Sequence, residues 1–310
     1  MFRPEGIYPA LLTPFGEDQR VNEEELRKLL DFCIDRGLDG IFPISSVGEG
    51  IHMDFAEKCR CMRIVVDQVD GRVPVTPGVV ASVPAECVRL ARYAAEIGCE
   101  AVVITPPYFY KPGGAMVERF FETIIEGSDI PVILYNIPLF TSPLDYDMVK
   151  RLVRYPNVVG MKDSSGSMVD FMHFMDKIAI AGEDISMLTG REETLLSCLL
   201  MGAKGCMTAT AGIFPEIMVG IYKAWQQGDL EKALQLQKLI LVVIRTMFAA
   251  PFPIGFKLAL ELRGIKMGPP LIPPSAADTY QINTVKSRLK MVMEPIIDAY
   301  CVPLKSEELA

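Results

Sequence analysis

Short apolar runs recur along the first two thirds of the chain, and they constrain its fold more than any other feature. The runs start roughly 20 to 35 residues apart, and polar residues hardly interrupt them. This pattern is typical of parallel strands that are covered on both faces, because neither face of such a strand meets water. Eight strands are predicted on this basis, at Ile7–Leu12, Gly40–Ile44, Val73–Pro77, Ala101–Thr105, Pro131–Tyr135, Val158–Lys162, Ile185–Thr189 and Gly205–Thr208.

The segments between the runs carry signals of amphipathic helices. Asn22 with Glu25, and Asp54 with Glu57, have the spacing of a helix N-cap and its reciprocal acid. Eight strand-then-helix units over residues 1–225 predict an α/β fold, a (β/α)8 TIM barrel. A doubly wound open sheet is the alternative. The even count favours closure, and no glycine-rich dinucleotide fingerprint follows the first run.

The pattern changes in residues 226–310, which predict helices without intervening apolar runs. Helical patterns cover residues 229–247, 255–263 and 284–300, and proline-rich turns join them. We expect a C-terminal helical extension packed on the barrel, not an independent domain.

Composition excludes several classes of protein. The net charge of −8 and the absence of a basic run argue against nucleic acid as a partner. No apolar stretch reaches the ~18 residues that a membrane span needs, and the N-terminus lacks a secretory apolar region. The eight cysteines are scattered, several inside apolar segments, which favours reduced thiols in a cytoplasmic protein. With two histidines, a histidine-rich metal site is excluded.

Lys162 and Tyr135 lie where chemistry is expected in such a fold. Each ends a predicted strand, and active sites of barrels lie at the carboxyl ends of strands. Adjacent strands are ~4.8 Å apart, so the two side chains can meet. Desolvation lowers the pKa of an amine and makes it a nucleophile toward ketones. The competing interpretation is a lysine that only reaches the solvent at the rim.

Other strand ends carry weaker signals. The small residues of Ser45–Gly50 can aim N–H groups at a carboxylate, although most such turns are only turns. The aromatic loop 105–112 lines either a pocket or an interface. The polar groups of Arg191, Glu192 and Glu193 either bind a polar substrate or form the charged first turn of a helix.

Three motifs together resemble the family of pyruvate-dependent class I aldolases that includes dihydrodipicolinate synthase and N-acetylneuraminate lyase. They are Tyr135-Asn136-Ile137-Pro138, residues 160–166 (Gly-Met-Lys-Asp-Ser-Ser-Gly) and residues 45–49 (Ser-Ser-Val-Gly-Glu). The resemblance extends from Gly6 to about Pro273. It implies a barrel with a C-terminal helical extension, a homotetramer, a small-molecule substrate, and no metal or cofactor.

The resemblance also implies roles for individual residues. Lys162 resembles the Schiff-base lysine and Tyr135 the proton-shuttling phenol. Ser46 and Val47 fall where the family holds the pyruvate carboxylate, and Ser46 would also relay protons to Tyr135. Tyr108 matches an aromatic that, in the synthases, reaches into the site of a neighbouring subunit. The remaining positions match substrate contacts: Met207, Ser164, Gly190, Glu192 and Glu193.

Three residues depart from the pattern of the synthases. Val47 replaces a threonine, so one hydroxyl is missing beside the carboxylate. Phe140 stands where the synthases place an arginine that binds the second substrate, and Arg191 is unusual at its position. Together, the apolar Phe140, Ser164 and the two glutamates resemble the 2-keto-3-deoxy sugar-acid aldolases of this family more closely than they resemble the synthases.

The predicted function is therefore that of a lyase with a lysine Schiff base, cleaving or forming a carbon–carbon bond between pyruvate and an aldehyde, with a 2-keto-3-deoxy sugar acid as the substrate. One alternative is 4-hydroxy-tetrahydrodipicolinate synthase, which condenses pyruvate with aspartate semialdehyde. Dehydration of an acid sugar through the same iminium is another. An alternative of a different class is a barrel that binds a keto acid without turnover. The motifs leave the aldehyde and the physiological direction open.

Overall fold

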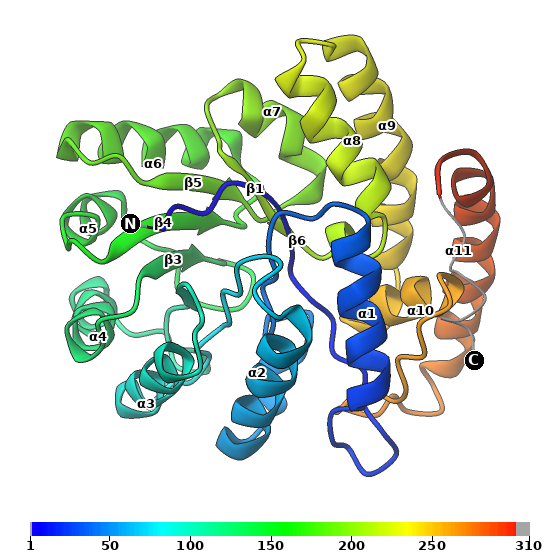
Figure 1. Ribbon diagram of the computed structural model, residues 1–310, viewed down its shortest axis with the longest axis horizontal. Coiled ribbons are helices and arrows are strands. Elements are labelled where there is room, and N and C mark those ends of the chain that lie inside the picture. The colour runs from blue at the N-terminus through cyan, green and yellow to red at the C-terminus, as the bar shows by residue number, and fades with distance from the viewer. Residues whose placement is uncertain (1, 302–310) are drawn as a thin grey trace.

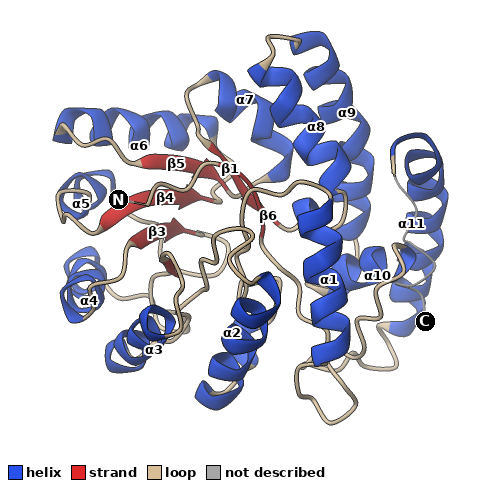
Figure 2. Cartoon of the chain, in the orientation of Figure 1, coloured by secondary structure: helices blue, strands red, loops and turns tan. Residues whose placement is uncertain are grey.

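Six parallel strands form one curled sheet at the centre of the molecule. The computed structural model describes residues 2–301. Within this range the strand order is β1-β6-β5-β4-β3-β2, with every strand residue buried. Figure 2 shows the strands enclosed by helices. The strands are β1 (Gly6–Pro9), β2 (Val102–Ile104), β3 (Val132–Asn136), β4 (Val158–Asp163), β5 (Ser186–Thr189) and β6 (Gly205–Thr208).

Two of the eight predicted strands do not form as regular strands. Segments 40–44 and 73–77 instead contribute isolated parallel bridges, which pair Ala10 with Phe42, Ile41 with Val75, and Gly78 with Val103. The bridges lead from the chain just after β1 round to β2, the two edges of the sheet. Prolines at positions 43, 74 and 77 lack the N–H that a continuous ladder would need, which accounts for the interruption.

Helices surround the sheet (Figure 1), and over residues 84–226 they alternate with the strands along the chain, as the sequence predicts. Because all the strands run in parallel, their carboxyl ends gather at one rim, where the connecting segments carry polar residues. The surrounding helices are α1 (Glu23–Asp35), α2 (Phe55–Val69), α3 (Pro84–Glu96), α4 (Gly114–Gly127), α5 (Tyr146–Leu152), α6 (Met168–Ala181), α7 (Leu195–Leu200) and α8 (Pro215–Gln226). In the described stretch from residue 6 to residue 96, helices α1, α2 and α3 follow β1 without a regular strand between them. Short 3-10 turns at Gly50–His52, Glu192–Thr194 and Thr210–Gly212 lie on the rim segments.

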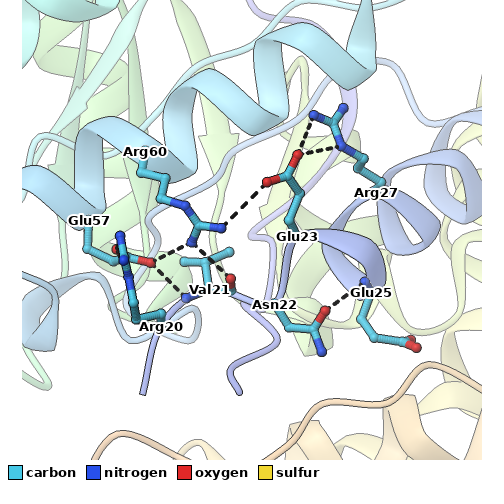
Figure 3. Close-up of polar contacts among 8 residues, drawn as sticks. All are labelled: Arg20, Val21, Asn22, Glu23, Glu25, Arg27, Glu57 and Arg60. Carbon is cyan, nitrogen blue, oxygen red and sulfur yellow. Dashed lines mark hydrogen bonds and ion pairs between the residues drawn. The ribbon is translucent and has the colours of Figure 1, made fainter. Parts of the chain in front are cut away.

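The two predicted N-caps are confirmed, but their acids bond elsewhere. The side chain of Asn22 accepts the N–H of Glu25 at 3.2 Å, and Asp54 accepts the N–H of Glu57 at 2.7 Å. The carboxylate of Glu57 accepts the N–H of Val21 at 2.7 Å, as Figure 3 shows. The predicted reciprocal bond is therefore replaced by a tie between α2 and the residues that precede α1.

The chain after α8 forms three further helices: α9 (Leu230–Met247), α10 (Ile254–Leu262) and α11 (Thr279–Tyr300). Helix α9 packs on α8, and α10 and α11 pack on α9 and on each other. The start of α11 lies five residues earlier than the predicted helix over 284–300. Residues 302–310 of the predicted extension lie outside the described residues. Between residues 2 and 301, no helix combines the length and apolarity needed to cross a membrane.

Candidate active site

Lys162 and Tyr135 lie side by side at the carboxyl ends of β4 and β3. The strand register pairs the two residues directly. The Nζ of Lys162 lies 4.0 Å from the ring centroid of Tyr135 and 4.7 Å from that of Phe42. Lys162 is only 2% exposed. Its amine therefore points into the protein against two aromatic faces, and the interpretation of a lysine reaching the solvent at the rim does not fit.

A glycine on the next strand makes room for this lysine. A Cβ at Gly190, which follows β5, would lie 2.5 Å from Cε of Lys162 and 2.0 Å from Oγ of Ser164. Gly160, which lies two residues before Lys162 on β4, meets other groups: a Cβ there would lie 3.1 Å from Pro4 and from the backbone oxygen of Ser186.

The hydroxyl of Tyr135 lies between two serine hydroxyls. Oγ of Ser46 is 3.5 Å away, with either group as donor, and Oγ of Ser164 donates to it at 3.4 Å. Both hydrogen bonds are long, which is common for catalytic groups before a substrate tightens the site. The three hydroxyls form a chain along which a proton can move near the amine of Lys162.

A buried polar pair holds the ends of these two strands. The carboxylate of Asp163 accepts bonds from Nδ2 of Asn136 and Oγ of Ser165, both at 2.7 Å. Oδ1 of Asn136 accepts the N–H of Leu144 at 3.0 Å. Burial raises the pKa of Asp163, and these hydrogen bonds oppose the rise. Sequence reasoning assigns no role to Asn136 or Asp163, although each directly follows one of the two central residues.

The turn Ser45–Gly50 is built differently, from residues in unusual backbone conformations. Ile44, just before the turn, and Glu49 within it have φ of 55° and 59°, in the left-handed region that residues other than glycine seldom adopt and that β-branched isoleucine adopts rarely. Oγ of Ser45 donates to the carbonyl of Leu11 and accepts the N–H of Gly48. These contacts fix the turn that presents Ser46 and Val47.

A buried ion pair ties this turn to the C-terminal helices. The carboxylate of Glu49 lies 2.8 Å from Nζ of Lys257 on α10 and accepts the N–H of Leu271 at 2.7 Å. Lys257 also donates to the carbonyl of Pro269. Burial lowers the pKa of Lys257, and the charge of Glu49 opposes the decrease. Sequence reasoning misses this pair. Its one signal is a lone lysine inside the otherwise apolar start of α10.

A cavity of about 60 Å³ brings together ten of the twelve predicted site residues. Seven further residues, all apolar, complete its wall, and three of them are phenylalanines that lie between the end of α9 and the first turn of α10. The ten are Lys162, Tyr135, Ser46, Val47, Met207, Ser164, Gly190, Arg191, Glu192 and Phe140, and the others are Ala10, Ile137, Leu139, Ala209, Phe248, Phe252 and Phe256.

Arg191 and Glu192, which line the cavity beside Lys162, are already engaged with protein groups. Nη2 of Arg191 lies 3.0 Å from Oε1 of Glu193, and its guanidinium lies over the ring of Phe248. Glu193 is not among the lining residues. The carboxylate of Glu192 accepts both the N–H and the Oγ1 hydroxyl of Thr210, and burial raises its pKa. These three residues therefore present fewer free polar groups than the sequence suggests.

A second cavity, of about 360 Å³, adjoins the first. Tyr108 lines it, but the two aromatic residues that follow it, Phe109 and the 79% exposed Tyr110, project from this loop. Phe109 is 89% exposed with a φ of 79°, whereas Tyr108 is half-buried and bonded through its backbone to Ser82. The two cavities share five lining residues: Ser46, Tyr135, Ile137, Phe140 and Phe252.

Comparisons with known proteins agree with this architecture. The sequence model of the dihydrodipicolinate synthetase family matches residues 3–292. A 4-hydroxy-tetrahydrodipicolinate synthase of Methanopyrus kandleri is 35% identical over 93% of this chain and 96% of its own. The crystal structure of YagE from E. coli K12, a member of the dihydrodipicolinic acid synthase family in complex with pyruvate, has a TM-score of 0.88. It is 29% identical, over 93% of this chain and 98% of its own.

A more distant structure shares the fold alone. N-acetylneuraminate lyase from Mycoplasma synoviae is 24% identical, with a TM-score of 0.83 over 96% of this chain and 98% of its own. The family match spans nearly all of the sequence that forms the sheet, the cavity and the added helices. The chain belongs to the dihydrodipicolinate synthetase family, a family of pyruvate-dependent class I aldolases and lyases.

Proposed function

We propose that the protein is a lyase that forms a Schiff base on Lys162 and makes or breaks a carbon–carbon bond between pyruvate and an aldehyde. One observation carries the proposal: the amine of Lys162 is buried in a cavity, beside the phenol of Tyr135 and opposite a turn of small residues. A structural lysine at this position would need a carboxylate partner. Lys162 has two aromatic faces instead.

In the proposed cycle the neutral amine of Lys162 attacks the C2 ketone of pyruvate. Loss of water gives an iminium, and loss of a proton from C3 gives the enamine, which attacks the aldehyde carbon. Tyr135 moves the protons, and Ser46 and Ser164 extend its reach. A positioned acid–base group of this kind contributes ~10²–10⁴-fold to the rate. Covalent activation and orientation supply the remainder.

We assign the carboxylate of the keto acid to the turn at Ser46 and Val47, both of which line the cavity. Val47 has no hydroxyl to offer, so the backbone N–H groups and the hydroxyl of Ser46 would hold the anion. Such successive N–H groups form concave sites for anions. The mechanism calls for no metal and no diffusible cofactor.

Architecture and assembly complete the proposal. The isolated bridges through segments 40–44 and 73–78 support closure of the sheet as a (β/α)8 barrel, with residues 226–310 as its extension. We propose a homotetramer in the cytoplasm. The aromatic loop 105–112 then offers a ring to a neighbouring subunit, either Tyr108, as the resemblance implies, or the exposed Phe109.

The sequence suggests two candidate aldehydes, and each has partial support. A sugar-acid aldehyde is supported by Ser164, Gly190 and Glu192 in the cavity, but Glu193 is paired with Arg191. Aspartate semialdehyde is supported by the name of the Methanopyrus relative. The carboxylate of aspartate semialdehyde needs a cation, however, and the guanidinium of Arg191 is already paired with Glu193. Both aldehydes stay predictions, as does dehydration of an acid sugar through the same iminium.

Reduction with borohydride tests the covalent step. The full chain is incubated with pyruvate and reduced, the mass of the intact protein is measured, and the protein is then digested for peptide mapping. The expected result is one pyruvate adduct on the peptide that contains Lys162, and none in Lys162→Ala. An adduct on the buried lysines Lys58 or Lys257, or no adduct at all, contradicts the proposal. Thermal stabilisation by pyruvate without product from any aldehyde would favour a binding protein without turnover.

A further inference from the structure

Asn136 and Asp163 directly follow the two central residues of the site, and they face away from it. The strand register pairs Asn136 with Asp163, as it pairs Tyr135 with Lys162. Successive side chains of a strand point to opposite faces, so this second pair lies on the outer side of the sheet. The described residues that line the cavity of Lys162 include neither member, whereas Asn136 lines a separate cavity against α5 and α6. The pair therefore lies behind the reacting atoms and does not contact them.

The carboxylate of Asp163 accepts three hydrogen bonds from two segments of the chain. Nδ2 of Asn136 donates to it at 2.7 Å, and Ser165 donates both its hydroxyl, at 2.7 Å, and its N–H, at 3.2 Å. Asn136 in turn accepts the N–H of Leu144 through its own Oδ1. These bonds tie the segment after β3 to the segment after β4. Ser164 lies in the chain between Asp163 and Ser165, so the bonds of the carboxylate hold it from both sides.

Main-chain hydrogen bonds connect the same pair to the groups around the amine. The N–H of Ser164 donates to the carbonyl of Asn136 at 2.8 Å, and the N–H of Gly190 donates to the carbonyl of Asp163 at 2.7 Å. Ser164 carries the hydroxyl that reaches the phenol, and Gly190 leaves room for the amine. The positions of both therefore depend on where the pair holds the ends of β3 and β4.

A carboxylate suits position 163 better than a neutral side chain of the same size. Its two oxygens only accept hydrogen bonds, so they can hold all three donors at once. An amide there would turn an NH₂ group toward one of these donors, so one of the three bonds would be lost or reversed. Burying a charge is costly, and Asp163 is only 3% exposed. The need for several acceptor positions explains a charge that packing alone does not require.

The hydroxyl contact that the pair supports tolerates little movement. Oγ of Ser164 donates to the phenolic oxygen of Tyr135 at 3.4 Å. O–H···O bonds usually measure about 2.5–3.0 Å, so this contact must shorten when the phenol reacts, and it is lost if Ser164 moves away. A donor at this place stabilises a phenolate, because hydrogen bonds to the charged form of a group favour that form.

We propose that Asn136 and Asp163 are positioning residues, which hold Ser164 against Tyr135 while protons are transferred. This inference rests on the proposed Schiff-base function. Tyr135 gives a proton to the departing water, and the phenolate that results accepts a proton from C3 of the iminium. The C–H bond breaks, its electron pair forms the C2–C3 double bond of the enamine, and the electrons of the C=N bond move to nitrogen. The hydroxyl of Ser164 stabilises the phenolate between these two transfers.

Exchange of the C3 protons of pyruvate tests this step without any aldehyde. The full chain is incubated with pyruvate in D₂O, loss of the methyl signal is followed by proton NMR, and borohydride trapping measures the imine. Asp163→Asn should lower the exchange rate at saturating pyruvate by about 10-fold or more. The trapped fraction at equilibrium and the pyruvate concentration for half-maximal exchange should stay as in the wild type. Asp170→Asn is the matched control and should exchange at the wild-type rate, because Asp170 lines the same outer cavity but accepts a bond from Tyr146.

Two further comparisons separate positioning from a general loss of structure. Combining Asn136→Asp with Asp163→Asn restores an amide beside a carboxylate, so this swap should recover part of the rate that each single change loses. Ser164→Ala should also slow the exchange. Its combination with Asp163→Asn should be no slower than the slower single variant, because both changes act through one hydroxyl. Ser165→Ala removes one donor to Asp163 without altering the buried charge, and it should show the same non-additivity with Ser164→Ala.

Three outcomes overturn the inference. The first is exchange at the wild-type rate in Asp163→Asn, or in Ser165→Ala where Asp163→Asn does not fold. The second is a swap that recovers none of the lost rate. The third is a combination with Ser164→Ala in which the two losses multiply, because independent losses mean that the pair only stabilises the fold. Absence of both exchange and imine in the wild type contradicts the proposed function instead.

Discussion

Two sides of the candidate site are built in contrasting ways. On one side, β3, β4 and β5 form a regular parallel ladder, and Tyr135 and Lys162 end it in direct register. On the other side, segments 40–44 and 73–78 contribute single bridges, and the turn that follows begins at Ile44 in a left-handed conformation. The ladder positions its side chains through the backbone, whereas the turn depends on the Glu49–Lys257 pair and on packing.

This difference suggests a division of labour. Groups that transfer protons or form bonds must be held within about half an ångström, which strands achieve better than loops. The keto-acid carboxylate needs only an array of N–H groups, which a turn offers. Changes on the strand side should therefore affect kcat, and changes on the turn side should affect stability and the KM for pyruvate.

The largest effect is expected on the strand side, from Tyr135→Phe. Loss of the phenolic hydroxyl removes the proton carrier but leaves the amine in place, so kcat should fall by ~10²–10⁴-fold. Steady-state kinetics and borohydride trapping measure the two effects separately. Tyr155→Phe, on a surface hydroxyl bonded to Glu126, is the control and should behave as the wild type. Full turnover in Tyr135→Phe would refute its role.

A smaller effect is expected on the turn side, from Lys257→Met. Removing one partner of a buried ion pair leaves the other charge uncompensated and typically costs about 3–5 kcal/mol of stability. Urea denaturation should show this loss, and Glu49→Gln combined with Lys257→Met should recover part of it. The KM for pyruvate should rise more than kcat falls. A decrease in kcat as large as that of Tyr135→Phe would contradict the proposed division of labour between the strand side and the turn side.

The smallest effect concerns Glu192, a buried carboxylate after β5 that bonds to Thr210 after β6. Burial raises the pKa of Glu192 above its unfolded value, so the folded state binds the proton more tightly. Its contribution to stability is fully present below the unfolded pKa and is lost as the pH rises through the folded pKa. Glu192→Gln, which can still accept the N–H of Thr210, should lose this pH dependence and gain stability at pH 7 relative to pH 4. Denaturation at the two pH values tests it, and an unchanged difference between them contradicts it.

The strand side is also the side that can be predicted from sequence. Uninterrupted apolar runs indicate buried parallel strands, and Lys162 and Tyr135 stand out because each ends such a run. On the turn side, Gly40–Ile44 and Val73–Pro77 have the same apolar character, but their prolines remove the donors that a strand requires. Apolar periodicity does not register hydrogen bonds, so two predicted strands are wrong in extent, although their single bridges lie between β1 and β2.

Partnerships between distant residues account for what sequence reasoning misses. Glu49 and Lys257 are more than two hundred positions apart, and no local pattern links them. Glu192 and Glu193 are adjacent and look alike in sequence, yet one bonds to Thr210 and the other to Arg191. On the aromatic loop, Phe109 and Tyr110 project outward while Tyr108 is half-buried, and composition does not predict the left-handed backbone of Phe109.

The aromatic surroundings of Lys162 have a consequence for the energetics of turnover. Ring faces attract cations, and those of Tyr135 and Phe42 flank the nitrogen. In the proposed cycle the attacking amine is neutral, and the iminium that it forms would place a positive charge at this nitrogen. The same two ring faces would therefore stabilise that charge as it develops, with little rearrangement of the surrounding protein.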